Sequence, residues 1–209
     1  MPLAVQASLL DLGDEVRLGA LSGAVHRTPL AHGAWVDHRP GWVEGSDPVL
    51  DALIRDIPWR HERRRMYDRV VAVPRLVAWY DAGSPLPHPV LADARAALAA
   101  FYRPALGEPF TTAGCCLYRD GRDSVAWHGD TIGRSATEDT LVAIVSFGSP
   151  RSLLLRPRAG GTSHAFRLGH GDLLVMGGSC QRTWEHAVPK TAQPVGPRVS
   201  VQFRPHGVA

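Results

Sequence analysis

One short stretch of the chain places two metal-ligating side chains next to each other. His128 and Asp130 are separated by Gly129, and in an extended segment residues two apart lie on the same face. His186, far along the chain, can supply a third ligand from another strand. Two histidines and one carboxylate form the facial triad of non-haem iron oxygenases, which leaves positions open for a chelating cosubstrate and dioxygen.

A second triplet has the same spacing. His170 and Asp172 also flank a glycine, but Asp172 opens an apolar run, which is typical of a turn that precedes a strand. His170 also lies close before His186, with room for little more than one hairpin between them. A His-x-Asp pattern is weak evidence by itself, because a given histidine has an aspartate two residues later in about one case in twenty. Spacing alone therefore favours the first triplet over the second only modestly.

The elements that must position these residues lie mostly after residue 110. Short apolar or alternating runs are separated there by Gly-, Pro- and Ser-rich turns, a pattern typical of a sandwich or barrel. The expected strands cover residues 141–147, 152–155, 164–168, 172–176 and 199–203. Upstream, amphipathic helices are predicted over residues 46–57 and 89–102. The pattern predicts an α+β fold with a jelly-roll core and the N-terminal helices packed outside it.

Length and composition fit one globular domain. The 209 residues are 44% hydrophobic and 21% charged, which excludes a disordered tail protein, a coiled coil or a collagen-like chain. No apolar run approaches the roughly 18–20 residues that span a bilayer, and the first residues lack the basic region of a signal peptide. We therefore expect a cytoplasmic protein with no membrane partner.

Cysteine and lysine usage adds two constraints. The chain has three cysteines and no C-x-x-C pair, which favours a reducing compartment over a disulfide framework or a zinc ribbon. Lys190 is the only lysine among 23 basic residues, and the net charge is only +3. Because arginine is so common throughout, arginine-rich stretches are weak evidence for phosphate binding.

Several motifs follow one another in a fixed order over residues 55–205. Residues 117–130 run from Leu-Tyr-Arg to the His-Gly-Asp triplet, and residues 198–204 have the form Arg-x5-Arg. Further motifs lie at residues 66–69, 73–80, 144–151, 171–176 and 184–190. Together they resemble the AlkB family of oxidative nucleic-acid dealkylases, and several ordered motifs are far more specific than any one of them.

The resemblance implies a role for each residue of the metal and cosubstrate sites. The Fe(II) ligands would be His128, Asp130 and His186, not the second triplet. Tyr118 and Arg198 would hold the distal carboxylate of 2-oxoglutarate, and Arg204 would lie near the carboxylate that chelates iron. Arginine suits these positions because its guanidinium can meet a carboxylate in a bidentate fork.

Cys116 departs from the family pattern. Family members usually carry an asparagine two residues before the tyrosine, where its amide bonds the cosubstrate, whereas this chain has Cys116 before Tyr118. A thiol is a weak donor, so the site either tolerates the loss or binds 2-oxoglutarate less well. A metal-bound thiolate is a third interpretation.

Substrate contacts are expected in a nucleotide lid around residues 58–88. Enzymes that flip a base hold it against aromatic or apolar surfaces, and basic side chains can bind phosphates. For the aromatic residues of the lid, packing in the core explains the sequence about as well as contact with a base does, and for Trp79 it explains the sequence better. For the arginines, the alternative to phosphate binding is a solvated, charged turn. The expected substrate residues are Tyr67, Tyr80, Trp127, Arg63, Arg64 and Arg65.

These features predict a monomeric Fe(II)- and 2-oxoglutarate-dependent dioxygenase with a double-stranded β-helix core. It would use dioxygen to remove N-alkyl groups from damaged DNA or RNA bases and release an aldehyde. Residues 1–45 would be an N-terminal extension of uncertain structure, followed by one catalytic domain over residues 46–209. Two alternatives remain open: the same chemistry on a protein or small molecule, or a metal- or nucleic-acid-binding module that has lost turnover.

Overall fold

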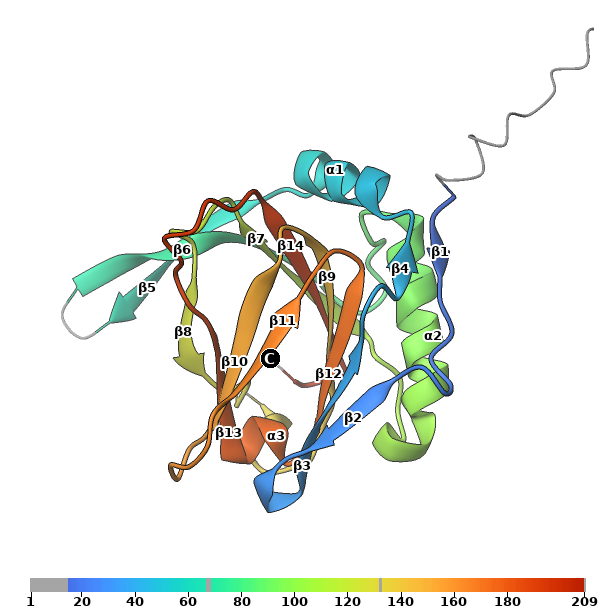
Figure 1. Cartoon of the computed structure of the whole chain (residues 1–209), viewed down its shortest axis with the longest axis vertical. Coiled ribbons are helices and arrows are strands. Elements are labelled where there is room, and N and C mark those ends of the chain that lie inside the picture. Colours follow the sequence, from blue (N-terminus) through green and yellow to red (C-terminus); the bar gives the residue numbers. More distant parts are fainter. Residues whose placement is uncertain (1–14, 67–68, 132, 209) are drawn as a thin grey trace, which may run out of the picture.

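A computed structural model describes residues 15–66, 69–131 and 133–208, without the side chains of residues 63–72. Two β-sheets face each other, and helices α1 (Asp47–Asp56) and α2 (Pro89–Leu106) cover the outer face of the larger sheet (Figure 1). In the described part of the chain, no helix is long and apolar enough to cross a membrane.

The larger sheet has eight strands, and the smaller sheet has four. The order in the larger sheet is β2 (His26–Pro29), β3 (Ala34–Arg39), β12 (Asp172–Gly178), β9 (Val142–Gly148), β14 (Arg198–Arg204), β7 (Thr112–Tyr118), β6 (Arg69–Tyr80) and β5 (Arg60–Met66). The order in the smaller sheet is β11 (His164–Leu168), β10 (Arg151–Pro157), β13 (Trp184–Val188) and β8 (Val125–His128). Short elements complete the fold: β1 (Arg17–Leu18) pairs with β4 (Val43–Glu44), and α3 (Cys180–Thr183) precedes β13.

The central strand β14 separates two chemically different layers. Its odd-numbered members Val199, Val201 and Phe203 are fully buried in the core under the helices, together with Leu91 and Leu98 of α2. Successive side chains of a strand point to opposite faces, so the polar members of β14 point into the space between the sheets. The apolar side chains fix the strand in the core, and the polar side chains are available to bind ligands between the sheets.

Both predicted helices are present. Helix α1 has proline in its first turn and ends before Pro58. Helix α2 begins after His88, whose Nδ1 accepts a hydrogen bond from the backbone N–H of Val90 at 3.2 Å. It runs beyond the predicted end and stops at Gly107, whose φ of 74° is the left-handed conformation that glycine adopts most readily at a helix C-terminus.

Residues 15–45, predicted only as an extension of uncertain structure, continue the larger sheet. Strand β3 pairs with β12 along its whole length, and β2 pairs with β3. The buried Asp37 of β3 accepts hydrogen bonds from Arg27 and from the hydroxyl of Tyr102 at 2.8 Å. This carboxylate therefore ties helix α2 to the first strands of the sheet.

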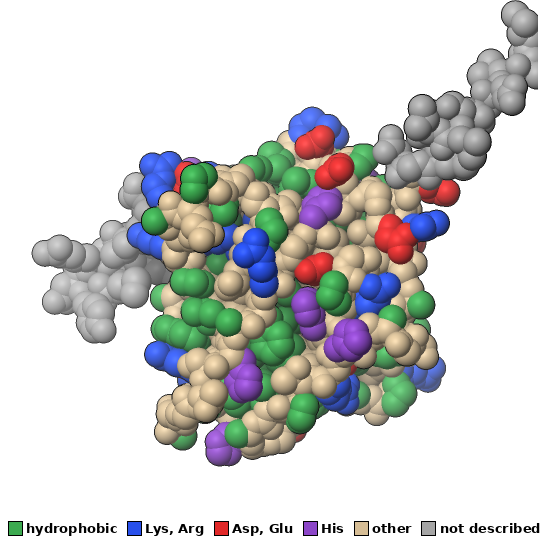
Figure 2. Space-filling view, in the orientation of Figure 1, with side chains coloured by type: hydrophobic (Ala, Val, Ile, Leu, Met, Phe, Trp, Pro, Cys, Tyr) green, Lys and Arg blue, Asp and Glu red, His purple; other side chains and the backbone are tan. Residues whose placement is uncertain are grey.

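The surface shows little segregation of charge on the face seen in Figure 2. Hydrophobic, basic and histidine side chains are interspersed there, and no broad patch of one charge forms among the side chains that are described on this face. This mixture agrees with the small net charge of +3.

Candidate metal centre and cosubstrate pocket

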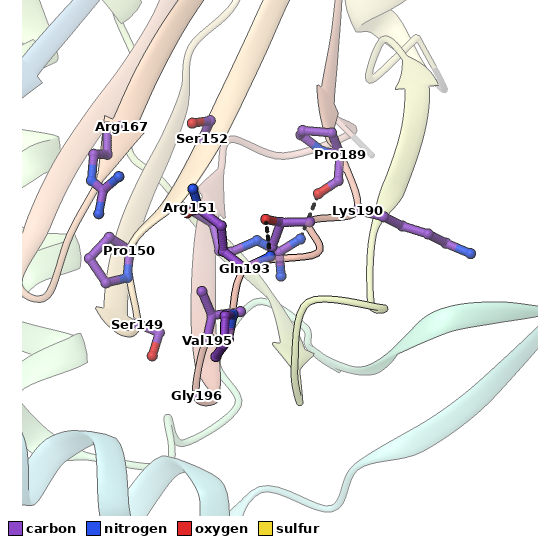
Figure 3. Close-up of a pocket in the computed structure, with 12 residues that line it drawn as sticks. Ser149, Pro150, Arg151, Ser152, Arg167, Pro189, Lys190, Gln193, Val195 and Gly196 are labelled. Atoms are coloured by element: carbon purple, nitrogen blue, oxygen red, sulfur yellow. Dashed lines mark hydrogen bonds between the residues drawn. The ribbon is translucent and has the colours of Figure 1, made fainter.

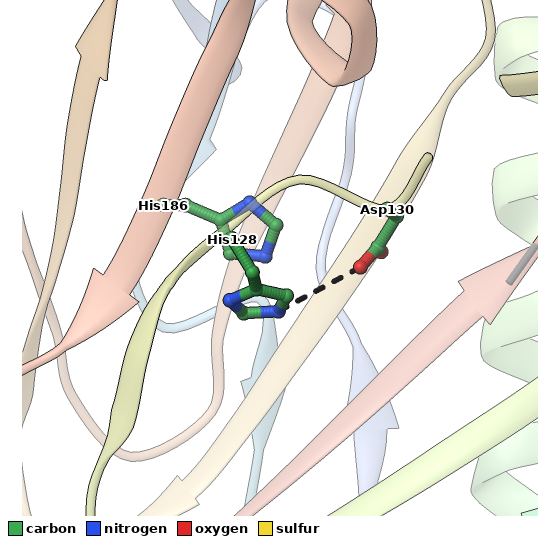
Figure 4. A group of neighbouring side chains, drawn as sticks. All are labelled: His128, Asp130 and His186. Carbon is green, nitrogen blue, oxygen red and sulfur yellow. Dashed lines mark ion pairs between the residues drawn. The ribbon is translucent and has the colours of Figure 1, made fainter. Parts of the chain in front are cut away.

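The three predicted metal ligands meet between the two sheets (Figure 4). His128 ends β8 and pairs with His186 of β13, and Asp130 lies in the loop that follows. One ligand atom of each residue lies within 4.8 Å of the others, and the imidazole rings of His128 and His186 are 4.2 Å apart. Among the described residues, no other group of three or more His, Cys, Asp or Glu side chains is arranged to hold a metal ion.

The electrostatic environment keeps His186 and Asp130 in their metal-binding forms. Burial, and secondarily the neighbouring His128, lowers the pKa of His186 to about 3, so this imidazole is neutral near pH 7. Burial opposes the charge of Asp130, but Arg204 and the two histidines hold its pKa well below the usual range. Neutral imidazoles and an ionised carboxylate are the forms that bind a divalent metal, so the donor set fits Fe(II).

Two side chains that the sequence interpretation missed also contact the metal-binding loop. Gln181 of α3 is buried, and its Oε1 accepts a hydrogen bond from the backbone N–H of Asp130 at 3.3 Å. Nη2 of Arg158 lies close to Gly129, and an added Cβ there would come within 2.2 Å of this atom. No local sequence pattern would have indicated either contact.

Polar side chains line the inner face of the central strands. The register pairs Arg198 of β14 with Tyr118 of β7, and Ser200 with Cys116. Because directly paired residues of an antiparallel sheet share a face, the predicted cosubstrate residues lie together, as their spacing requires. The members of this polar face on β14 are Arg198, Ser200, Gln202 and Arg204.

Arg198 lies at one end of this polar face and is only 2% exposed. Its Nε donates to Oγ of Ser146 at 2.9 Å, whereas its Nη1 is buried and has no hydrogen-bond partner among the described residues. The guanidinium carbon lies 5.2 Å from the ring of Tyr118. Burial, and secondarily Cys116, raises the pKa of Tyr118 to about 12. A neutral hydroxyl beside an incompletely paired guanidinium fits the binding of a carboxylate.

Arg204 lies at the other end of the polar face. It was predicted near the cosubstrate carboxylate that chelates iron. Its Nε and Nη2 donate to Oδ2 of Asp130 at 3.1 and 2.9 Å, and its Nη1 is buried without a partner among the described residues. Arg204 therefore both orients a predicted metal ligand and retains one N–H for a further acceptor.

Of the predicted substrate residues, the structure describes the side chains of Tyr80 and Trp127, which do not meet at this centre. Tyr67 and the side chains of the arginine cluster fall outside the described residues; the cluster is Arg63, Arg64 and Arg65. Tyr80 packs against the core on the helical side of the larger sheet. The ring of Trp127 lies against the guanidinium of Arg156, whose carbon is 4.3 Å from the ring centre, and Arg156 donates to Oε2 of Glu185.

The prediction that Trp79 packs in the core is wrong. Trp79 is 57% exposed, because it alternates along β6 with Ala78 and Tyr80, which face the core. Its ring lies over Gly114, where an added Cβ would come within 2.8 Å of Cζ3. The ring is also 5.5 Å from the guanidinium of Arg204. Trp79 is therefore an exposed aromatic surface beside the metal-binding group.

The second histidine–aspartate triplet holds turns together. Nδ1 of His170 accepts a hydrogen bond from the backbone N–H of Gly148 at 2.7 Å, and Nε2 lies 3.2 Å from Asp47 of α1. Asp172 accepts hydrogen bonds from the backbone N–H groups of Gly41 and Gly169, each at 2.7 Å. These contacts agree with the turn interpretation of this triplet.

A cavity of about 430 Å³ lies away from the three metal-binding residues, between the start of β10 and the loop after β13 (Figure 3). Arg151 contributes to its wall and is buried. Its guanidinium donates to the carbonyls of Asp120, Asp123 and Pro189. This arginine therefore joins three loop segments.

The family model for the 2OG-Fe(II) oxygenase superfamily matches residues 63–204. The chain is 32% identical over 190 residues to the human protein named Alpha-ketoglutarate-dependent dioxygenase alkB homolog 3, covering 79% of this chain and 64% of that protein. It is 29% identical over 191 residues to DNA oxidative demethylase ALKBH2 of Arabidopsis thaliana, covering 74% of this chain and 60% of that protein. The chain thus spans a little less than two thirds of the length of these relatives.

A solved structure titled "The structure of OsALKBH1" superposes with a TM-score of 0.57 at 15% identity, covering 87% of this chain and 100% of that chain. This similarity in fold confirms the predicted double-stranded β-helix with helices outside it. The family match and the sequence relatives agree with the order of motifs along the chain. The chain belongs to the 2OG-Fe(II) oxygenase superfamily, and the curated relatives named here are AlkB homologues.

Proposed function

We propose that this chain is an Fe(II)- and 2-oxoglutarate-dependent dioxygenase that removes N-alkyl groups from damaged bases of DNA or RNA. The observation that carries the proposal is the convergence of His128, Asp130 and His186 within 4.8 Å in a chain of this family. The name of the Arabidopsis relative, a DNA oxidative demethylase, supports the choice of substrate.

Different residues of the chain would bind the metal ion and the cosubstrate. His128, Asp130 and His186 would hold Fe(II), which with 2-oxoglutarate and dioxygen supplies the oxidation of a C–H bond. Arg198 and Tyr118 would bind the distal carboxylate of 2-oxoglutarate, since both are buried and the Nη1 of Arg198 lacks a partner among the described residues. The hydroxylated alkyl group would then leave the base nitrogen as an aldehyde, formaldehyde in the case of methyl.

Trp79 would supply the surface on which a flipped base stacks. Its ring is exposed and lies beside Arg204, which itself contacts Asp130. Stacking on an aromatic side chain tolerates any base, because every base has a π-face. A base held there would lie close to the metal-binding group and outside the duplex stack.

Release of formaldehyde and formation of succinate test the proposal. The protein would be incubated with Fe(II), 2-oxoglutarate and methylated single- or double-stranded DNA or RNA, with the unmethylated oligonucleotides and the His128→Ala variant as controls. Formaldehyde and succinate in equal amounts, only with a methylated strand, support it. Succinate without demethylation of any strand points to a protein or small-molecule substrate. Absence of both products points to a binding module without turnover.

We also propose that the protein acts as a monomer in the cytoplasm. The three cysteines are free thiols, a state that suits a reducing compartment. Light scattering after size-exclusion chromatography tests the monomer, and a dimer at micromolar concentration would contradict it.

A further inference from the structure

Arg75 of β6 reaches the same polar face as the cosubstrate residues. Val77 pairs with Cys116 of β7, and Arg75, two residues earlier on the strand, lies on the same face as Val77. Its Nε donates to Sγ of Cys116 at 3.4 Å, and its Nη1 reaches the carbonyl of Ser124 at 3.5 Å. The pairing joins the lid strand to the strand on which the family pattern places an asparagine.

The contacts that the protein gives this guanidinium are weak. A thiol sulfur is a poor acceptor, and 3.5 Å is at the outer limit of a hydrogen bond to a carbonyl. Burial opposes the charge of Arg75, and the carboxylate of Glu62 favours it. The guanidinium has five N–H donors, so it retains capacity for an anion.

Another cation on this face, Arg198, is in a similar state. It is almost fully buried, its Nε donates to Ser146, and its Nη1 has no partner among the described residues. Tyr118 is close to both arginines: the guanidinium carbon of Arg198 lies 5.2 Å from its ring, and Arg75 contacts Cys116, two residues before Tyr118 on β7. Burial of the two guanidiniums beside the phenol of Tyr118 costs free energy, because their hydrogen-bond partners are weak or missing. An anion that accepts hydrogen bonds from both would offset this cost.

We propose that Arg75 is a second cationic ligand of the distal carboxylate of 2-oxoglutarate, and that it takes the place of the amide that Cys116 lacks. This inference rests on the proposed function, because it concerns the same cosubstrate. Cys116 accepts a weak hydrogen bond from Arg75, and in the proposed arrangement the guanidinium, not the thiol, donates to the cosubstrate. The departure at Cys116 therefore does not by itself weaken cosubstrate binding.

Anaerobic calorimetry of 2-oxoglutarate binding to the Mn(II)-loaded protein tests the inference without turnover. Arg75→Met keeps much of the side-chain length and removes the charge. It should weaken binding by about tenfold or more, since one hydrogen bond to a charged group is worth roughly 1.5–3 kcal/mol. Arg75→Lys should lose less, and the exposed Arg122→Met serves as a matched control that should bind as the unmodified protein does.

A cosubstrate analogue separates ligation from a structural role. 2-Oxopentanoate has the same chain length but lacks the distal carboxylate, so Arg75→Met should leave its affinity unchanged. Equal losses for both compounds would show that Arg75 only maintains the fold and would overturn the inference. The Mn(II) affinity of each variant reports whether the metal-binding group is intact.

The double variant tests the replacement directly. Cys116→Asn alone should change the affinity by less than about threefold, whereas in the Arg75→Met background it should restore most of the affinity that Arg75→Met removes. A double variant as weak as Arg75→Met would contradict the replacement. If the unmodified Mn(II) protein does not bind 2-oxoglutarate at all, the proposed function fails. If it binds and Arg75→Met binds equally well, only the inference on Arg75 fails.

Discussion

Arg204 holds Asp130 through one carboxylate oxygen and leaves the other toward the histidines. Nε and Nη2 of Arg204 both reach Oδ2, at 3.1 and 2.9 Å, while Oδ1 lies 3.7 Å from Nε2 of His128. The side chains of Arg204 and Asp130 are both buried. A carboxylate held in this way presents a single oxygen to a metal ion, and its rotation is restricted before the metal arrives.

Arg204→Lys should therefore weaken metal binding even though it keeps the positive charge. A lysine cannot form the two-pronged contact with Oδ2, and the loss of such an outer partner typically costs about 10–100-fold in metal affinity. Titration with Mn(II) or Fe(II) under argon measures the effect. Arg198→Met is the matched control and should bind the metal normally without cosubstrate. Equal metal affinity in Arg204→Lys would contradict the positioning role.

The two histidine–aspartate triplets should respond in opposite ways to alanine. His128→Ala should abolish metal binding and turnover, because it removes one of three ligands. His170→Ala should keep both, but it should lower the melting temperature because Gly148 loses its acceptor. Metal titration and thermal unfolding of both variants check this. Metal loss in His170→Ala with retention in His128→Ala would reverse the assignment.

Trp79→Ala should reduce demethylation and oligonucleotide binding without loss of fold. Stacking of one base is worth roughly 1–3 kcal/mol, so a roughly 5- to 150-fold weaker affinity for a methylated oligonucleotide is expected, by about 1.4 kcal/mol per tenfold. The ring is 57% exposed, and the melting temperature should change little. Trp127→Ala, which removes a ring packed on Arg156, is the control. A stronger effect at Trp127 than at Trp79 would refute the stacking surface.

The arginine cluster should set the salt dependence of binding. With a net charge of only +3, phosphate attraction requires a local basic patch. For each phosphate that is no longer paired with an arginine, the slope of log affinity against log salt should become shallower by about 0.7–0.9. Fluorescence anisotropy at several salt concentrations compares the unmodified protein with the triple glutamine variant of Arg63, Arg64 and Arg65. An unchanged affinity and slope would identify the cluster as a solvated turn.

Elements with strong local signals were predictable from the sequence. The helix at residues 46–57 and the strands that carry alternating or apolar runs are confirmed, although the expected capping side chain makes no cap hydrogen bond at the start of this helix. Strands β2 and β3 were not, because β3 pairs with β12, which is distant in the sequence, and the Gly- and His-rich composition of residues 1–45 carries no periodic pattern. Pairing between distant strands depends on tertiary contacts that local propensity does not contain.

The candidate site also combines features that the sequence predicts with contacts between distant parts of the chain that it does not predict. The motif order predicted the residues that converge, namely His128, Asp130 and His186. Contacts made across the fold were out of reach, such as Gln181 to the Asp130 backbone and Arg75 to Cys116. Trp79 was misread because a large aromatic residue is usually buried, whereas its strand parity with Ala78 and Tyr80 turns it outward.

The position of β14 makes the last described strand the closing element of the larger sheet. This strand lies between β9 and β7, which do not pair with each other, and it follows every other described strand in the sequence. Without residues 198–204 the larger sheet would consist of two separate parts, β2-β3-β12-β9 and β7-β6-β5. The same strand carries Arg198 and Arg204, and Arg204 holds Asp130. The continuity of the larger sheet and the geometry of the metal-binding group therefore depend on the same seven residues.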